Sequence, residues 1–132
     1  MKETVSVGRQ AFGRVGESEA ERLLRRKGYR ILDRNVRSPS GEIDLVAQAG
    51  KVLVFVEVKA RRTDVLGGAG QAVDGRKQAR LIKLAARYLA RRRLRQQACR
   101  FDVVLCTGGT DKPEAIEHIE NAFEVPGEDL RW

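Results

Sequence analysis

Residues 41–61 read GEIDLVAQAGKVLVFVEVKAR, which is two apolar runs separated by a short polar turn. The second run is almost continuous in Val, Leu and Phe, as is typical of a strand covered on both faces, and the first reads as its hairpin partner. Three charged residues interrupt these runs: Asp44, Glu57 and Lys59. Because an unpaired charge taken out of water costs several kcal/mol or more, these side chains need each other or a bound cation.

The length of the hairpin loop decides whether the three charges meet. A two-residue loop at 49–50 places Asp44 opposite Phe55 and one diagonal step from Glu57, and a four-residue loop keeps this register. Because side chains alternate along a strand, Asp44, Glu57 and Lys59 then share one face of the sheet, and the valines between them take the other. A loop of odd length would separate Asp44 from the other two.

This arrangement predicts a metal site. Two carboxylates at one place repel each other unless a cation lies between them, and oxygen ligands suit hard ions such as Mg²⁺ or Mn²⁺. Lys59 lies too far along the strand to neutralise both, but it could activate a water or stabilise charge on a phosphate under attack. The predicted chemistry is therefore phosphodiester hydrolysis.

The spacing of Asp44 from the Glu-x-Lys of residues 57–59 resembles the PD-(D/E)XK nuclease superfamily, whose core runs helix, three strands, helix, strand. Six motifs are similar to the YraN family of small bacterial proteins, and the likeness covers about residues 8–123. They are GExxAxxxL from residue 16, GYxILxRN from 28, GEIDLVA from 41, FVEVKxR from 55, RFDVV from 100 and IEHIENAF from 116. The YraN family is described as endonuclease-like and is related in fold to archaeal Holliday-junction resolvases.

This resemblance implies an α/β fold with a restriction-endonuclease-like core, in which helices flank a mixed central sheet. It implies a metal-dependent DNA endonuclease, for which branched DNA or recombination and repair intermediates are candidate substrates. A homodimer is compatible with it, because junction-cutting relatives act as dimers, but the sequence leaves the oligomeric state and the preferred DNA structure open. The resemblance also implies that Glu17 in the first helix joins the metal site and that the Val58 carbonyl helps to hold the ion. The simpler alternative for Glu17 is a charge preference at a helix N-terminus. Glu42 shares the face of Asp44 and is either a further ligand or an exposed residue.

Composition limits the protein class. A chain of 132 residues with 42% hydrophobic content predicts a single domain, with residues 124–132 as a tail. No apolar run approaches membrane-spanning length, and residues 1–12 lack the apolar stretch of a secretory signal, so we expect a cytoplasmic protein without a membrane partner. Cys99 and Cys106 should point to opposite faces of a strand as bystander thiols. His118 is the only histidine and reads as a half-exposed strand residue.

Basic charge is concentrated between residues 75 and 100, which hold ten Lys and Arg and no acid. A basic stripe follows three- and four-residue steps on one helix face: Arg76, Arg80, Lys83, Arg87 and Arg91. Lys77 in the first turn and Arg61 beyond the hairpin could also contact phosphate. The stripe predicts binding to a DNA backbone. Three alternatives remain: a solvated helix face, a non-catalytic nucleic-acid-binding or adaptor protein, and a module that meets an acidic protein.

The remaining pattern predicts the other elements. We expect a helix over 16–27 that ends at Gly28, a strand over 29–34 and a helix over 75–94 capped by Asp74. A glycine-rich loop should cover 61–70, a strand 101–107, and a last strand or edge element 115–122. Asp102 should form a structural ion pair with an arginine.

Overall fold

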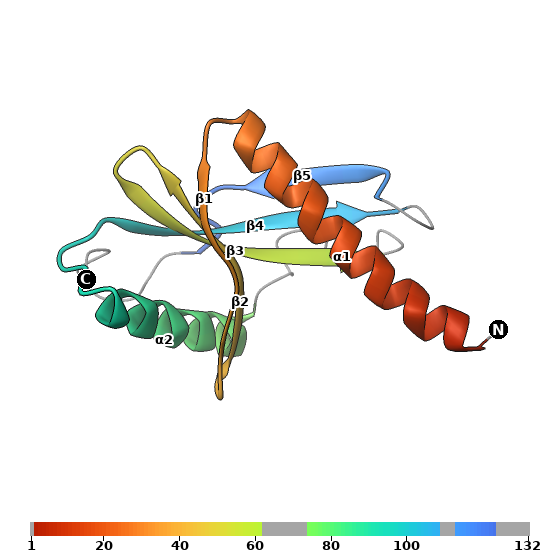
Figure 1. Cartoon of the computed structure of the whole chain (residues 1–132), viewed down its shortest axis with the longest axis horizontal. Helices are drawn as coiled ribbons and strands as arrows, with labels where there is room; N and C mark the ends of the chain where they lie inside the picture. Colours follow the sequence, from red (N-terminus) through yellow and green to blue (C-terminus); the bar gives the residue numbers. More distant parts are fainter. Residues whose placement is uncertain (1, 62–73, 109–112, 124–132) are drawn as a thin grey trace.

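A computed structural model describes residues 2–61, 74–108 and 113–123, with side chains placed for residues 14–60 of the first range. Within these ranges the chain forms α1 (Lys2–Arg26), β1 (Arg30–Ser38), β2 (Gly41–Ala49), β3 (Val52–Arg61), α2 (Gly75–Arg91), β4 (Cys99–Thr107) and β5 (Ala115–Ile119). The predicted order of helix, three strands, helix and strand is confirmed, and β5 follows it as an additional edge strand (Figure 1). Neither described helix is long and apolar enough to cross a membrane.

The described strands form one mixed sheet in the order β1-β2-β3-β4-β5. β3 and β4 are parallel and are connected through α2, whereas the other neighbours are antiparallel. α1 and α2 lie on opposite faces of the sheet (Figure 1). The predicted α/β fold, a mixed central sheet flanked by helices, is therefore confirmed.

Alternation along β3 divides the core into two layers. Val54 and Val56 pack toward α1 with Ala20 and Leu24, whereas Phe55 packs toward α2. The two buried cysteines fall in different layers, Cys99 on the α2 side and Cys106 on the α1 side, as the sequence predicted, and both are free. The same alternation directs Glu57 of β3 toward α2.

Gly16 lies inside α1, so the prediction that the helix begins there is wrong. A Cβ at Gly16 would lie 3.4 Å from Cβ of Ala60 and 3.6 Å from Sγ of Cys106. The glycine therefore allows the helix to approach the sheet closely, and it does not mark a helix end. The predicted C-terminus is confirmed, because Gly28 has φ +91° and the Tyr29 amide donates to the Leu24 carbonyl at 2.9 Å, which is a Schellman-type cap.

The start of α2 is confirmed. The side chain of Asp74 accepts a hydrogen bond from the Lys77 amide at 2.9 Å. The helix ends at Arg91, three residues before the predicted end, because Arg93 turns the chain with φ +57°. The predicted loop over 61–70 and the predicted tail over 124–132 lie outside the described residues, apart from the end of β3.

Candidate functional site

The site begins where β2 separates from β3. The hairpin loop is Gly50-Lys51, and the strands pair from Ala49↔Val52 to Leu45↔Val56. The predicted loop at 49–50 is wrong by one position, so the register of the hairpin differs by two residues from the prediction. If the observed register is continued one residue beyond Leu45↔Val56, Asp44 lies opposite Glu57. Beyond Leu45, β2 continues to pair with β1 as far as Ser38↔Gly41.

The side chain of Asp44 accepts a backbone hydrogen bond from β3 just beyond the point where the pairing of β2 with β3 ends. Its Oδ2 accepts a hydrogen bond from the Val58 amide at 2.8 Å. The bond holds the carboxylate between the separating strands, where the residues around it are mostly buried. The prediction that Asp44 and Glu57 share a face is confirmed, because both line one cavity of about 230 Å³ against α2.

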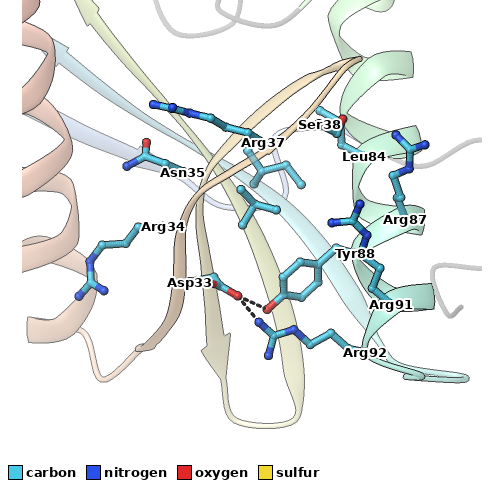
Figure 2. Close-up of a pocket in the computed structure, with 12 residues that line it drawn as sticks. Asp33, Arg34, Asn35, Arg37, Ser38, Leu84, Arg87, Tyr88, Arg91 and Arg92 are labelled. Carbon is cyan, nitrogen blue, oxygen red and sulfur yellow. Dashed lines mark hydrogen bonds and ion pairs between the residues drawn. The ribbon is translucent and has the colours of Figure 1, made fainter.

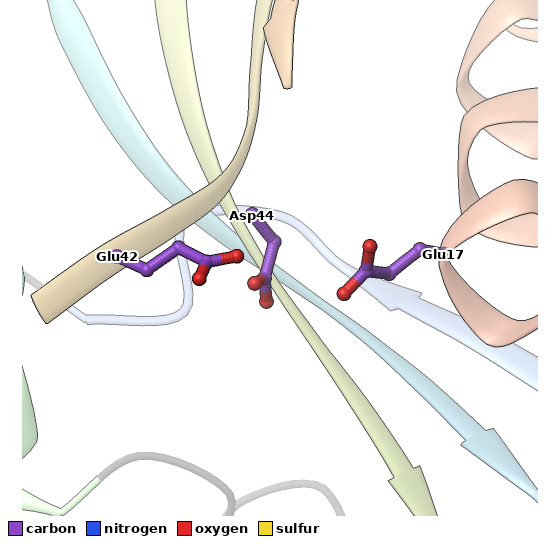
Figure 3. A group of neighbouring side chains, drawn as sticks. All are labelled: Glu17, Glu42 and Asp44. Atoms are coloured by element: carbon purple, nitrogen blue, oxygen red, sulfur yellow. The ribbon is translucent and has the colours of Figure 1, made fainter. Parts of the chain in front are cut away.

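Two more carboxylates join them. Oxygens of Glu17, Glu42 and Asp44 lie within 4.8 Å of one another, with Glu17 reaching in from α1 and Glu42 from β2 (Figure 3). Glu57 is buried, 8% exposed, and lines the cavity with Glu42 and Asp44. We call Glu17, Glu42, Asp44 and Glu57 the carboxylate cluster. The close approach of α1 at Gly16 explains how Glu17, the next residue, reaches the sheet.

Burial and the neighbouring carboxylates make ionisation of Asp44 and Glu17 less favourable. Burial raises the pKa of Asp44 to about 7, Glu57 adds to this effect, and the Val58 amide partly opposes it. Burial, followed by the charges of Glu42 and Glu57, raises the pKa of Glu17. A divalent cation would relieve the repulsion, and a donor set made of carboxylate oxygens suits a hard ion.

Lys77, from α2, provides the ammonium that contacts Glu57. The sequence predicts Lys77 either as a phosphate contact or as a side chain extended along the edge of the core, and its place on the inward side of the first turn is the signal that it could reach the sheet. Lys59 is partly buried on β3 beside Leu105 of β4, and in the described part of the chain no ion pair involves it.

The residues predicted to contact phosphate do not all lie in the cavity of the carboxylate cluster. Arg80 lines the same cavity as the carboxylates, and Arg87 lines a second cavity beside it. Arg76 and Lys83 are exposed on α2. The side chain of Arg61 lies outside the described residues.

Asp102 lies apart from the carboxylate cluster. It is 1% exposed, and Nε of Arg100 donates to its Oδ1 at 2.9 Å, which confirms the predicted ion pair. Nε2 of His118 lies 2.8 Å from Oδ2 of Asp102, and the His118 side chain is 1% exposed. The prediction that His118 is a half-exposed residue is therefore wrong for its side chain, because the Tyr29 ring packs edge-on against the imidazole with 5.6 Å between ring centroids and Asp102 contacts its Nε2.

Comparison with known proteins identifies the family. Residues 16–106 match the uncharacterised protein family UPF0102. A UPF0102 protein of Moorella thermoacetica is 44% identical over 120 residues, covering 90% of this chain and 100% of the relative. One from Symbiobacterium thermophilum is 52% identical over 113 residues, covering 86% and 96%, and one from Frankia casuarinae is 48% identical over 115 residues, covering 87% and 98%. The chain therefore belongs to the UPF0102 family, which is the YraN family that its motifs resemble.

Proposed function

We propose that this protein is a metal-dependent nuclease that hydrolyses phosphodiester bonds in DNA. The observation that carries the proposal is the carboxylate cluster, in which oxygens of Glu17, Glu42 and Asp44 lie within 4.8 Å of one another at the separation of two strands. Repulsion among four neighbouring carboxylates from three elements does not stabilise the fold. A bound cation would remove this repulsion, so the cluster is a candidate ion site.

In this proposal Asp44 and Glu57 hold Mg²⁺ or Mn²⁺, and Glu17, Glu42 and the Val58 carbonyl complete the oxygen set. The ion supplies Lewis-acid stabilisation of charge on the phosphate under attack. Val58 keeps Asp44 in place through its amide. Arg80 lines the same cavity and is placed to bind a phosphate oxygen through its planar fork.

Two lysines can assist the reaction. Lys77 holds Glu57 in the structure, and it would become available to a phosphate once a cation takes over that carboxylate. Lys59 follows Glu57 on the same strand face and would orient or deprotonate the attacking water. Each role predicts a loss of turnover when the lysine is removed.

The proposal is tested by cleavage. Labelled linear, nicked, flapped and four-way branched DNAs are incubated with parent protein and Mg²⁺ or Mn²⁺, with a chelator control. Asp44→Asn with Glu57→Gln should abolish cleavage, while Glu114→Gln with Glu120→Gln, two exposed acids outside the cluster, should retain it.

Calorimetry with the metal alone separates two negative results. If the parent binds the metal through the cluster but cuts none of the DNAs, the result favours the alternative of a non-catalytic nucleic-acid-binding or adaptor protein that retains the fold. Equal metal affinity in the parent and in the Asp44→Asn, Glu57→Gln variant would disprove the metal site itself.

A further inference from the structure

A second cavity, of about 320 Å³, lies beside the carboxylate cluster between β1 and α2 (Figure 2). Residues 33–38 of β1 form one wall, and α2 forms the other from Leu84 to Arg92. Leu84 lines both cavities, so they are neighbours along α2. We call this second cavity the arginine groove.

Positive charge dominates the arginine groove. Five arginines and one aspartate line it. Three of the arginines pair with carboxylates: Arg34 with Glu21, Arg37 with Glu42 and Arg92 with Asp33. Arg34 points away toward α1 (Figure 2). Arg87 and Arg91 are exposed and make no ion pair with any described residue, so no described carboxylate competes with an anion for their guanidinium groups.

The floor of the groove is apolar. Val36, Ile43 and Leu84 line it with the ring of Tyr88, whose hydroxyl is fixed by a 3.1 Å hydrogen bond to Oδ2 of Asp33. The floor is mainly aliphatic, because Tyr88 is the one aromatic residue among the described residues that line it. Asn35 adds an amide group and has φ +48°, a left-handed conformation within β1.

An apolar floor below a cationic rim suits an unpaired nucleotide. The base can lie against the floor while its phosphate meets the guanidinium groups, and a positively charged groove along the backbone is common to proteins that bind single strands. A duplex keeps its bases paired inside and would leave the floor unused. The volume is also at the lower end of the range of ligand pockets, about 300 Å³, and thus fits a small unit.

We propose that the arginine groove binds an unpaired nucleotide of the strand that reaches the carboxylate cluster, so the substrate is a nucleic acid with a single-stranded segment beside the cut. This inference rests on the proposed function. Arg80, in the cavity of the carboxylates, and Arg91, in the groove, are eleven residues apart on α2, which is about 16 Å at 1.5 Å per residue. Several consecutive phosphates cover such a span.

The test measures binding without cleavage. A labelled oligothymidylate and a blunt DNA hairpin with the same number of phosphates are titrated in chelator, and fluorescence anisotropy reports affinity at several salt concentrations. Arg87→Gln with Arg91→Gln removes the two available cations. Arg26→Gln with Arg95→Gln removes the same charge at exposed positions outside the groove.

We expect the parent to prefer the single strand and the groove variant to lose about tenfold in affinity for it. The salt slope of the groove variant should fall by roughly 1.4, because each single-strand phosphate contact contributes about 0.7. The control pair should change affinity by less than about twofold, since exposed charges outside the contact are largely screened. An equal loss in the control pair, or a parent that binds the duplex as tightly, would overturn the inference.

Amide chemical shifts of the parent give a test that needs no variant. Oligothymidylate should shift residues 33–38 and 84–92, and shifts confined to other elements would also overturn the inference. Cleavage assays separate this inference from the proposed function. Groove binding without cleavage refutes only the nuclease, whereas cutting of blunt duplex without single-strand preference refutes only the groove.

Discussion

Asp44 combines a structural contact with an electrostatic one. Its Oδ2 accepts the Val58 amide at the point where β2 leaves β3, and its charge meets those of Glu17, Glu42 and Glu57. Protonation of Asp44 therefore reduces the electrostatic repulsion within the carboxylate cluster when no cation is bound. The residue holds the strands in place and limits how many negative charges the site can carry.

This arrangement predicts a pH dependence of stability in chelator. Burial and Glu57 raise the folded-state pKa of Asp44 from 3.8 to about 7, so between these values the folded protein keeps a proton that the unfolded chain has released. The free energy of unfolding attributable to Asp44 should fall as pH rises through this window. Glu21, whose pKa is lowered to about 2 by its hydrogen bonds to Arg34, acts at lower pH with the opposite sign.

Urea unfolding at several pH values measures the effect. Asp44→Asn should flatten the fall between pH 4 and 7, and saturating Mg²⁺ should reduce it in the parent. Glu120→Gln, an exposed acid outside the cluster, should leave the parent's pH dependence unchanged. A variant of Asp44 with the parent's pH profile would contradict the role of its buried carboxyl group.

The ion pair between Lys77 and Glu57 predicts competition with a metal ion. Lys77→Met should raise the affinity for Mg²⁺ by roughly tenfold, because a neighbouring positive charge no longer opposes the ion. It should also lower the melting temperature in chelator, since Glu57 loses its cation. Lys59→Met is the matched control, and calorimetry should find little change in its metal affinity. Equal affinities for parent and Lys77→Met would place Lys77 away from Glu57 in solution.

The order of elements could be predicted from the sequence, but some of their contacts could not. Hydrophobic alternation and the caps at Asp74 and Gly28 located both helix boundaries that the structure confirms. The hairpin register was wrong by two residues because Gly50 takes the left-handed conformation of the turn, with φ +64°, one position earlier than a loop at 49–50 requires. The face of Asp44 survived this error because the side-chain period is also two.

Contacts between distant elements were beyond the reach of sequence patterns. Helical periodicity placed Lys77 on the inward side of α2, but the position of α2 over the sheet decides that it contacts Glu57. The approach of α1 likewise decides that Glu17 joins Asp44. The groove depends on β1 extending to Ser38 beside α2, four residues beyond the predicted end of that strand.

Gly41 allows the start of β2 to pass close to α2. Its φ is +144°, and a Cβ there would lie 3.1 Å from Cδ of Arg80. Gly41→Ala should cost about 1 kcal/mol or more of stability, and should also weaken DNA binding by displacing Arg80. Gly50→Ala is the matched control, because it has φ +64° and nothing within 4 Å of its Cβ. Urea unfolding and anisotropy should show a stability loss for both variants and a binding loss for Gly41→Ala alone.

At the scale of the whole molecule, a polar network separate from the carboxylate cluster stabilises the β4–β5 side of the sheet, which is the side away from β1. The Lys27 ammonium can only donate, so Nδ1 of His118 accepts at 2.9 Å and Nε2–H donates to Asp102. Asp102 also accepts from Arg100 and from the Asn121 amide at 3.0 Å. The network thus connects the end of α1 with β4 and β5.

Removing the Asp102 side chain should destabilise the fold while leaving the arrangement of the carboxylate cluster unchanged. Although burial raises the pKa of Asp102, the hydrogen bonds from His118, Arg100 and Asn121 outweigh it, and the pKa is lowered. Asp102→Ala should cost about 3–5 kcal/mol, the usual loss when one partner of a buried pair is removed. Glu120→Gln, whose carboxylate is exposed and 4.0 Å from Arg100, should cost less than about 1 kcal/mol. Urea unfolding compares them, and similar losses would contradict the network.

The neighbouring cavities of opposite charge have a thermodynamic consequence. In the proposed complex, a strand held by Arg87 and Arg91 would bring phosphates toward Asp44 and Glu57, whose negative charge would repel them until a divalent cation binds. Each ligand therefore removes a barrier to the other, and linkage requires that the cation tighten strand binding by the same factor by which the strand tightens cation binding. If both proposals hold, the polyanion and the ion should bind cooperatively, and neither alone should reach its full affinity.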